Sequence, residues 1–287
     1  MVTALRPGDD AYPAALLDLS QPPNPIYAIG AELLLARGPE RTVAIVGTRE
    51  ATPYGIRVAT DLAAAFAAAG VVVVSGLARG VDSAAHRGAL ESGGGTVAVL
   101  GTGVDVPYPA GNRALHEAIC GRGIVISENE PGTRARLGCF PRRNRIIAAL
   151  AKVTIVVEAG FKSGAINTAA QALELGRTVA AVPGPIFAPT SQGANVLVRD
   201  GAQVITSVGD ALELYGLSPA AGAEPGDLPE SEAAVWSGLG QGAGSIDELA
   251  ARTGLPVRHV LEGLAGLELR GLVDELVGGG VRRRSQA

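Results

Sequence analysis

The chain has 287 residues, of which 47% are hydrophobic, and its 24 basic and 28 acidic side chains give a formal net charge of -4. This length and composition predict a globular protein with one large and one small domain. The N-terminus does not resemble a leader and no long apolar run is found, so neither secretion nor a membrane span is expected. The cytoplasm is therefore the expected location. With only Cys120 and Cys139, the sequence predicts no disulfide framework and no zinc site.

Seven short apolar runs, rich in β-branched residues, recur along the chain at residues 42–47, 71–76, 96–101, 123–127, 153–159, 178–184 and 202–205. Their continuous hydrophobicity is typical of strands that are buried on both faces. Ala-rich segments of helical length separate them, such as 54–70 and 165–176, and both end at a glycine suited to a helix C-terminus. The alternation predicts an α/β fold, namely a Rossmann-like, doubly wound and mainly parallel sheet.

Ligands of such sheets bind beyond the carboxyl ends of the strands, where loops lead into helices. The five loops that follow the first five strands are rich in Gly, Ser, Thr or Arg, and they span residues 47–55, 75–82, 101–112, 127–145 and 158–168. These residue types supply free backbone N–H groups, hydroxyls and guanidinium groups. The sequence therefore predicts an anion-binding rim at this edge of the sheet.

The segment GCFPRRNRIIAALA, residues 138–151, places Arg142, Arg143 and Arg145 at the start of a predicted helix. A cation near a helix N-terminus is disfavoured by roughly 0.3–1 kcal/mol. Between residues 134 and 145 there are five arginines and no carboxylate, although the chain is acidic overall. We expect an external anion to compensate them; an internal ion pair with Glu128 or Glu158 is the alternative for any single arginine.

No motif indicates a nucleotide cofactor or a catalytic site. The first loop reads Gly-Thr-Arg rather than G-x-G-x-x-G, and the chain has no G-x-x-x-x-G-K-[ST], which disfavours NAD and a P-loop nucleotide. Asp82 and His86, four residues apart, could form a dyad or half a metal site, but a capping Asp and a packed His are the simpler interpretation. Glu128, Glu130 and Glu158 could act as acids or bases, or could hold the arginines. We expect no enzyme activity, no cofactor and no metal.

From about residue 41 to 202, eight motifs stand in unbroken order, among them VAIVGTR, VSGLARGVDSAAHRGAL, FPRRNRIIAAL and VVEAGFKSGAINTA. In this order they resemble the DNA-processing protein A family, also called DprA or Smf. The resemblance implies a Rossmann-like core without known catalytic activity that binds single-stranded DNA and forms homodimers. It further implies that the protein protects incoming DNA and loads the RecA recombinase on it during natural transformation, in competent cells.

Carried over motif by motif, the basic DNA pocket of this family falls on Thr48, Arg49, Ser75, Gly76, Arg142, Asn144, Arg145, Lys162, Ser163 and Gly164. Shortly before its Phe-Pro pair the family often has a basic residue, which Leu137 replaces in this sequence. Arg136, next to it, is therefore included among the expected DNA-binding residues. Phe140 could stack on a base or belong to the core.

Many members also carry a helical domain ahead of the core, where this sequence has only about forty residues. Two rival functions remain open: a phosphoribohydrolase-like nucleotide-processing enzyme acting through Glu158 or Asp82, and a structural adaptor.

Domain boundaries are predicted from composition: a lead-in segment at 1–40, the core at 41–215, a Pro/Gly/Ala linker at 216–230 and a C-terminal domain at 231–287. Helix patterns at 230–240, 245–254 (with Ser245 as N-cap) and 255–271 (with Pro256 near its start), followed by a hairpin at 272–284, predict a winged helix-turn-helix, as in the family.

The predicted recognition helix of this domain is electrically neutral, because Arg258 and Arg270 are balanced by Glu262 and Glu268. A helix that reads the major groove is normally basic. The pattern favours a protein-contact or regulatory role, with Arg282, Arg283 and Arg284 as an auxiliary phosphate contact or a solvated tail.

Overall fold

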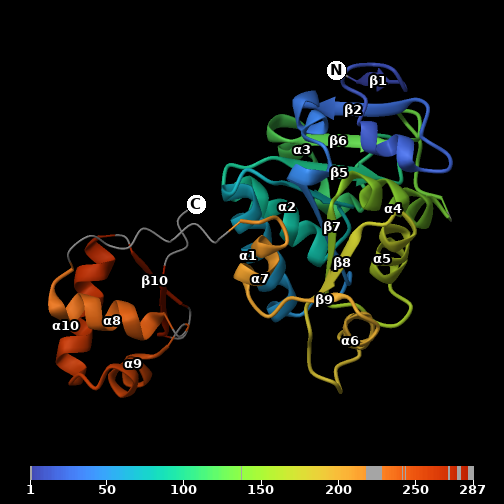
Figure 1. Ribbon diagram of the computed structural model, residues 1–287. Coiled ribbons are helices and arrows are strands. Elements are labelled where there is room, and N and C mark those ends of the chain that lie inside the picture. The colour runs from blue at the N-terminus through green and yellow to red at the C-terminus, as the bar shows by residue number, and fades with distance from the viewer. Residues whose placement is uncertain are drawn as a thin grey trace. The chain divides into compact units, whose positions relative to one another are not determined.

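The computed structural model describes residues 2–136, 138–217, 228–240, 242, 244–270, 272–276 and 279–283. The chain divides into two compact units, Met1–Ala220 and Ala221–Gln286, and Figure 1 shows both. Most of the predicted linker, residues 218–227, lies outside the described residues. Within the described part of the chain, no helix is both long and apolar enough to cross a membrane.

The larger unit is built on one nine-stranded sheet with the order β1-β2-β6-β5-β4-β3-β7-β8-β9. The pairs from β6 to β9 are all parallel, and β1 and β2 are antiparallel to their neighbours. The strands are β1 (Thr3–Leu5), β2 (Ile26–Gly30), β3 (Thr42–Gly47), β4 (Val72–Ser75), β5 (Thr96–Leu100), β6 (Ile124–Ser127), β7 (Val153–Val157), β8 (Thr178–Ala181) and β9 (Gln203–Val204). The predicted mainly parallel, doubly wound sheet is confirmed.

Helices cover both faces of this sheet, and the two faces carry separate apolar cores (Figure 1). One face packs against α1 (Pro53–Ala68), α2 (Val81–Glu91) and α7 (Val208–Glu213), and α3 (Arg113–Arg122) continues this layer beside α2. The other face packs against α4 (Cys139–Leu150), α5 (Gly164–Glu174) and α6 (Gln192–Arg199). Because both faces are covered, β3, β4, β5 and β7 are buried along almost their whole length, as their continuous apolar runs predict.

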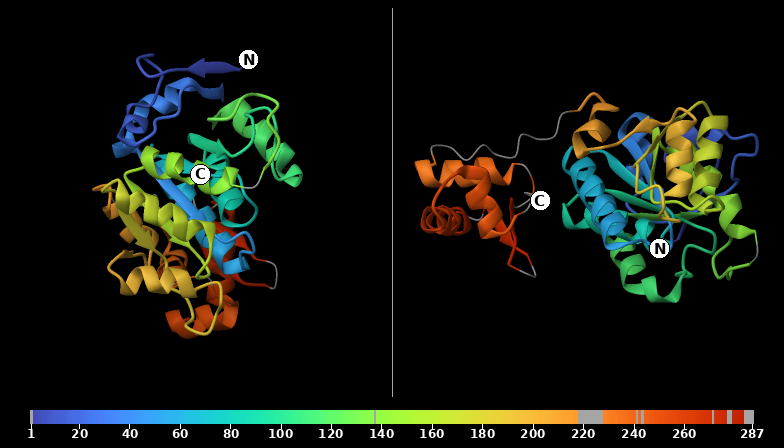
Figure 2. Two further views of the ribbon diagram at one scale, coloured as in Figure 1. Left: turned by 90° about the vertical axis from the view of Figure 1, so that its right-hand side faces the viewer. Right: turned by 90° about the horizontal axis from the view of Figure 1, so that it is seen from below.

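The lead-in segment contributes two strands that the sequence analysis did not predict. Figure 2 shows it in dark blue at one end of the larger unit. It also contains the short 3-10 helices η1 (Ala14–Asp18), η2 (Glu32–Arg37) and η3 (Pro39–Arg41). β2 pairs with β6, which would otherwise be the edge of the parallel sheet. Neither strand belongs to the seven apolar runs from which the sheet was predicted.

The smaller unit has the helix, helix, helix, hairpin order of a winged helix. Its elements are α8 (Glu230–Leu239), α9 (Ile246–Thr253), α10 (Val257–Leu269), β10 (Val273–Glu275) and β11 (Val281–Arg283). Its core includes Val235, Leu249, Val260 and Leu267. Ser245 caps α9 in a capping box with Glu248, and α10 begins directly after Pro256, as predicted.

Candidate nucleic-acid interface

A cavity of about 820 Å3 opens at the carboxyl edge of the parallel strands. We call it the rim cavity. Loops after three neighbouring strands form it together with the start of α4. Of the predicted DNA-binding residues, those that line it are Thr48, Arg49, Phe140, Asn144, Lys162, Ser163 and Gly164.

The sheet topology explains why residues so far apart in sequence meet here. β3 lies between β4 and β7, all three are parallel, and Gly47 at the end of β3 is in register with Val157 at the end of β7. Their loops therefore leave the sheet at the same edge. The helices α2, α4 and α5 start at this edge, and residues from their first turns line the cavity. Helix N-termini carry partial positive charge and free N–H groups, which favours an anion.

Four cationic side chains line the rim cavity, against the two carboxylates of Glu50 and Asp82. Arg49, Arg79 and Lys162 are exposed. None of these three forms an ion pair with any residue that the structure describes. The cavity thus has an excess of positive charge and cations that are free to meet a ligand.

Arg143 is the fourth cation, and it is built into the wall of the cavity. Its side chain is only 4% exposed, and its Nη1 donates to the backbone carbonyls of Gly76, at 2.6 Å, and of Val99. A Cβ at Gly76 would lie 2.4 Å from the guanidinium, so a larger residue there would displace the Arg143 side chain. Burial lowers the pKa of Arg143 to about 10, partly offset by the nearby Asp82, so the group remains charged at neutral pH.

Asp82 and Glu158, the predicted candidates for acid or base chemistry, are both buried and occupied by backbone donors. Asp82 accepts from the N–H groups of Gly76 and Ala78. Its burial raises its pKa, opposed by Arg143 and these hydrogen bonds. Glu158 accepts from the N–H of Thr52, at 2.9 Å, and from the Thr52 hydroxyl, at 2.6 Å, at the start of α1. Both carboxylates therefore shape the loops of the rim.

His86 forms neither a dyad with Asp82 nor half a metal site; it is a packed histidine, which was the simpler interpretation. It is fully buried, and its Nδ1 lies 2.7 Å from the hydroxyl of Thr96, not beside Asp82. Burial lowers its pKa to about 3. Over the described residues there is no group of three or more His, Cys, Asp or Glu side chains that could hold a metal ion.

Asn144 and Ser163 set the geometry of the Lys162 loop. Asn144 donates its amide hydrogens to the carbonyl of Gly164, at 3.2 Å, and to Oδ1 of Asn167, at 3.1 Å. Ser163 caps α5 by accepting from the N–H of Ala165. The first turn of α5 is thereby fixed against α4, beside the cavity.

The predicted convergence on this cavity is wrong for Arg142 and Arg145, and Arg143, which was expected to point away from them, is the arginine of α4 that lines it. Both pair with Glu128, whose side chain is 6% exposed, at 3.3 Å from Arg142 Nε and 2.6 Å from Arg145 Nη2. Arg145 also donates to the carbonyl of Gln21 in the lead-in segment. The cause is helical geometry: successive side chains differ by about 100° in direction, so only Arg143 points into the rim. The alternative of an internal ion pair holds for these two arginines.

Three further predicted residues also lie outside the rim cavity: Ser75, Arg136 and Gly76, the last of which lines a second cavity described below. Ser75 is fully buried, and its hydroxyl donates to the carbonyl of Ile45, at 2.6 Å, so its predicted place on the rim is wrong. Arg136 is exposed but lines none of the cavities described in the larger unit. Conversely, Arg79 lines the rim cavity although the sequence analysis did not select it. Its place in the loop after β4, between Ser75 and Asp82, was the available signal.

A second cavity of about 450 Å3, which we call the aromatic cavity, adjoins the first and shares Arg49, Arg79, Phe140 and Arg143 with it. Gly76 lines only this second cavity. The rings of Tyr108 and Phe140 stack there, with centroids 5.0 Å apart, and the Arg49 guanidinium lies 5.5 Å from the Phe140 centroid. Phe140 therefore borders the site but already has two neighbours on its ring.

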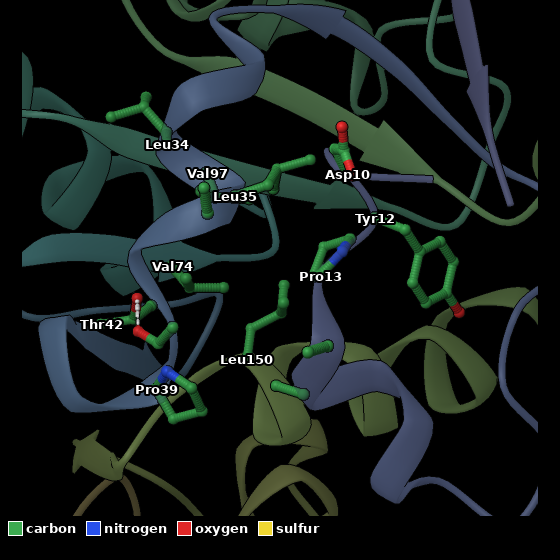
Figure 3. A pocket seen from close by; sticks show the side chains of 14 residues that line it. Asp10, Tyr12, Pro13, Leu34, Leu35, Pro39, Thr42, Val74, Val97 and Leu150 are labelled. Atoms are coloured by element: carbon green, nitrogen blue, oxygen red, sulfur yellow. Dashed lines mark hydrogen bonds between the residues drawn. The ribbon is translucent and has the colours of Figure 1, made fainter. Parts of the chain in front are cut away.

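A third cavity, of about 200 Å3, lies between the lead-in segment and the sheet, where Leu35, Val74, Val97 and Leu150 surround it (Figure 3). Asp10 and Thr42 are polar exceptions in a mostly apolar lining. None of the predicted DNA-binding residues lines it. We interpret it as a packing gap beneath the lead-in segment.

In the smaller unit, both arginines of the recognition helix form ion pairs, although Arg270 pairs with Glu232 of α8 rather than with Glu268 of its own helix. Arg258 lies 3.8 Å from Glu262, and Arg270 lies 2.7 Å from Glu232 of α8. In the wing, Arg282 lies 4.0 Å from Asp274, and Arg283 lies over the ring of Trp236, 4.1 Å from its centroid. Arg284 lies outside the described residues.

Comparison with known proteins identifies the family. Residues 3–216 match the family described as DNA recombination-mediator protein A, and residues 219–279 match the DprA winged helix domain. A putative DNA processing protein DprA of Mycobacterium tuberculosis is 45% identical over 289 residues, covering 94% of this chain and 74% of that protein.

Two solved structures share the fold. DNA processing protein A of Streptococcus pneumoniae is 39% identical, with a TM-score of 0.69 over 74% of this chain and 73% of that one. The Helicobacter pylori protein, studied for its single-stranded DNA binding mode, is 33% identical, with a TM-score of 0.66 over 72% of this chain and 92% of that one. The chain thus belongs to the DNA recombination-mediator protein A family, known as DprA or Smf.

Proposed function

We propose that this chain binds single-stranded DNA and that the rim cavity holds the sugar-phosphate backbone of the strand. The observation that carries the proposal is the set of exposed cations, Arg49, Arg79 and Lys162, which converge from three loops without a carboxylate partner among the described residues. Guanidinium, ammonium and helix N-terminal N–H groups are the usual partners of phosphate. The Helicobacter pylori relative, which was studied for this binding, supports the same assignment.

A single strand fits the site better than a duplex because its bases are free to contact protein. Aromatic side chains beside a basic groove are typical of single-strand sites, and Tyr108 and Phe140 stand beside these cations. The neutral recognition helix of the smaller unit offers no basic surface for a duplex groove.

The wider role follows from the family. We propose a mediator that acts in the cytoplasm during natural transformation, protects incoming strands, and loads the RecA recombinase on them. In a homodimer, two rim cavities would give a longer track for one strand. We propose that the protein does this without a catalytic step of its own and without a cofactor.

The rival function, a phosphoribohydrolase-like enzyme acting through Asp82 or Glu158, has less support. Both carboxylates are buried and accept hydrogen bonds from backbone N–H groups or from the hydroxyl of Thr52. Such a group is poorly placed to exchange a proton with a bound nucleotide. Turnover of nucleoside monophosphates that is lost on Glu158→Gln or Asp82→Asn would favour the enzyme instead.

Binding at several salt concentrations tests the proposal. The full chain should bind a labelled single-stranded oligonucleotide more tightly than the matching duplex. Arg49→Ala and Lys162→Ala should each weaken binding and lower the slope of log affinity against log salt by about 0.7, the value for one lost phosphate contact on a single strand. Arg57→Ala, an exposed arginine on α1 that pairs with Asp61, is the matched control. An unchanged slope in both cavity variants would contradict the placement.

A further inference from the structure

The packing gap beneath the lead-in segment lies at the opposite edge of the sheet from the rim cavity. Thr42, which lines the gap, is the first residue of β3, whereas Gly47 at the other end of β3 lines the rim cavity. Val74 of β4, Val97 of β5 and Leu150 at the end of α4 form the wall on the side of the sheet (Figure 3). The lead-in segment, with residues of η1 and η2, forms the wall on the other side.

The gap is large enough for a ligand, and it reaches the surface. Its volume is about 200 Å3, whereas an engineered apolar cavity of roughly 150 Å3 in another protein binds benzene or xenon. Ala14 and Ala36, both in the lining, are exposed to solvent. A small molecule can therefore enter between the lead-in segment and the sheet without unfolding the core.

The hydroxyl groups around the gap have already donated their hydrogens. Among the lining residues, all of which the structure describes, only Asp10, Tyr12 and Thr42 have polar side chains. The Tyr12 hydroxyl donates to the carbonyl of Pro23, and the Thr42 hydroxyl donates to the carbonyl of Gly38, both at 2.8 Å. In Figure 3 the Tyr12 hydroxyl points away from the gap. Because a buried water needs about two to four polar partners, an apolar occupant is favoured over water.

The charge at the mouth of the gap disfavours an anionic occupant. Asp10 is the one charged side chain in the lining, and it is exposed. Its carboxylate repels an anion, and the apolar wall behind it offers no partner for a buried charge. A neutral molecule with little polar surface meets neither penalty, and it gains from the removal of its apolar surface from water.

We propose that this gap is a binding site for one small, uncharged apolar molecule, the size of a single six-membered carbon ring or a short aliphatic chain. Shape and the exclusion of water select the ligand, because the lining offers it no hydrogen-bond donor. Binding stabilises the lead-in segment on the sheet, since the ligand contacts both. The site is separate from the proposed binding of single-stranded DNA, because it shares no lining residue with the rim cavity.

Titration of the full chain with benzene, followed by methyl NMR, tests the site directly. The methyl resonances of Val74, Val97 and Leu150 should shift and saturate with one dissociation constant. Val73, the neighbour of Val74 in β4, belongs to the core on the opposite face, so its methyl resonances should not move. A roughly hundredfold excess of benzene over this constant should raise the midpoint of thermal unfolding of the larger unit by roughly 5 °C.

A filling substitution tests the position of the ligand. Val97→Phe adds a ring inside the gap and should weaken benzene binding about tenfold or more, because the two rings compete for one space. Val257→Phe adds a ring at an exposed valine of the smaller unit and should retain the affinity. If circular dichroism shows that Val97→Phe does not fold, Val74→Ile should still weaken binding, and Val73→Ile on the opposite face should not.

Two further measurements test the class of ligand and the separation from DNA. Benzoate carries the same ring with a negative charge and should produce no saturable methyl shift. Saturating benzene should leave the affinity for a single-stranded oligonucleotide unchanged.

The site would be overturned by the absence of a saturable shift at Val74 and Val97, by equal shifts on both faces of the sheet, or by full benzene affinity in Val97→Phe. Benzoate binding as tight as benzene binding would overturn the assignment to an uncharged ligand. A chain that binds benzene as described but no single-stranded DNA would contradict the proposed function alone.

Discussion

Two sets of cationic side chains in the larger unit differ in what neutralises them. Arg142 and Arg145 on α4 share the buried carboxylate of Glu128. Arg49, Arg79 and Lys162 come from three separate loops and meet no carboxylate among the described residues. Neighbouring positions in the sequence therefore do not make a common site here, whereas the parallel sheet brings distant loops together.

Arg143 sharpens this comparison because it lies between the exposed Arg142 and the largely buried, paired Arg145, and is itself only 4% exposed. Arg143→Met should lower the free energy of unfolding by about 3 kcal/mol, since the carbonyls of Gly76 and Val99 lose a charged donor and Asp82 loses its nearby cation. Arg142→Met, at a side chain that is 67% exposed, should change it by no more than about 0.5 kcal/mol. Urea denaturation measures both, and equal losses would contradict the distinction.

The buried side of the comparison also predicts a pH dependence, through His86. Its hydroxyl partner Thr96 donates to the carbonyl of Val73, so His86 Nδ1 carries the hydrogen and the buried Nε2 has no partner among the described residues. Because its pKa falls from 6.5 when unfolded to about 3 when folded, the unfolded chain gains a proton first as the pH drops. As the pH falls from 7 to 5, this histidine alone should lower the free energy of unfolding by about 2 kcal/mol.

The measurement is the free energy of unfolding at several pH values in that range. The glutamine of His86→Gln cannot titrate, so the free energy of unfolding of this variant should fall less steeply with decreasing pH. At pH 5 the difference in slope from the wild type should correspond to close to one bound proton. Parallel pH profiles for the variant and the wild type would show that His86 does not titrate as predicted.

A smaller effect separates the two sets of cations in ligand binding. Arg79→Ala should weaken single-strand binding about fivefold, near 1 kcal/mol, and lower the salt slope by about 0.7. Arg145→Ala should leave the salt slope unchanged, because the Arg145 side chain is only 15% exposed and its guanidinium is already paired with Glu128. Circular dichroism would check that both variants fold. A larger loss of affinity and of salt slope in Arg145→Ala than in Arg79→Ala would indicate that the α4 arginines contact the DNA.

Much of the fold could be predicted because it depends on local pattern. Apolar runs such as 42–47 and 153–159 became β3 and β7, and Ser245 became the cap of α9, since burial on both faces and capping chemistry leave a signature within a few residues. β1 and β2 were missed because they form by pairing with each other and with β6, not from a pattern of their own.

The candidate site was predicted in part. Arg49 and Lys162 follow strand ends, and the strand order places such loops at one edge. Ser75 also ends a strand, yet its side chain turns into the sheet.

The sequence by itself determined the α/β architecture, the winged helix and the edge of the sheet at which the Gly-rich and Arg-rich loops lie, because hydrophobic period and turn chemistry act over short distances. Only the tertiary structure decided which charges remain free. Whether an arginine meets a carboxylate, a carbonyl or solvent depends on side-chain direction and on groups more than a hundred residues away, such as Gln21 for Arg145.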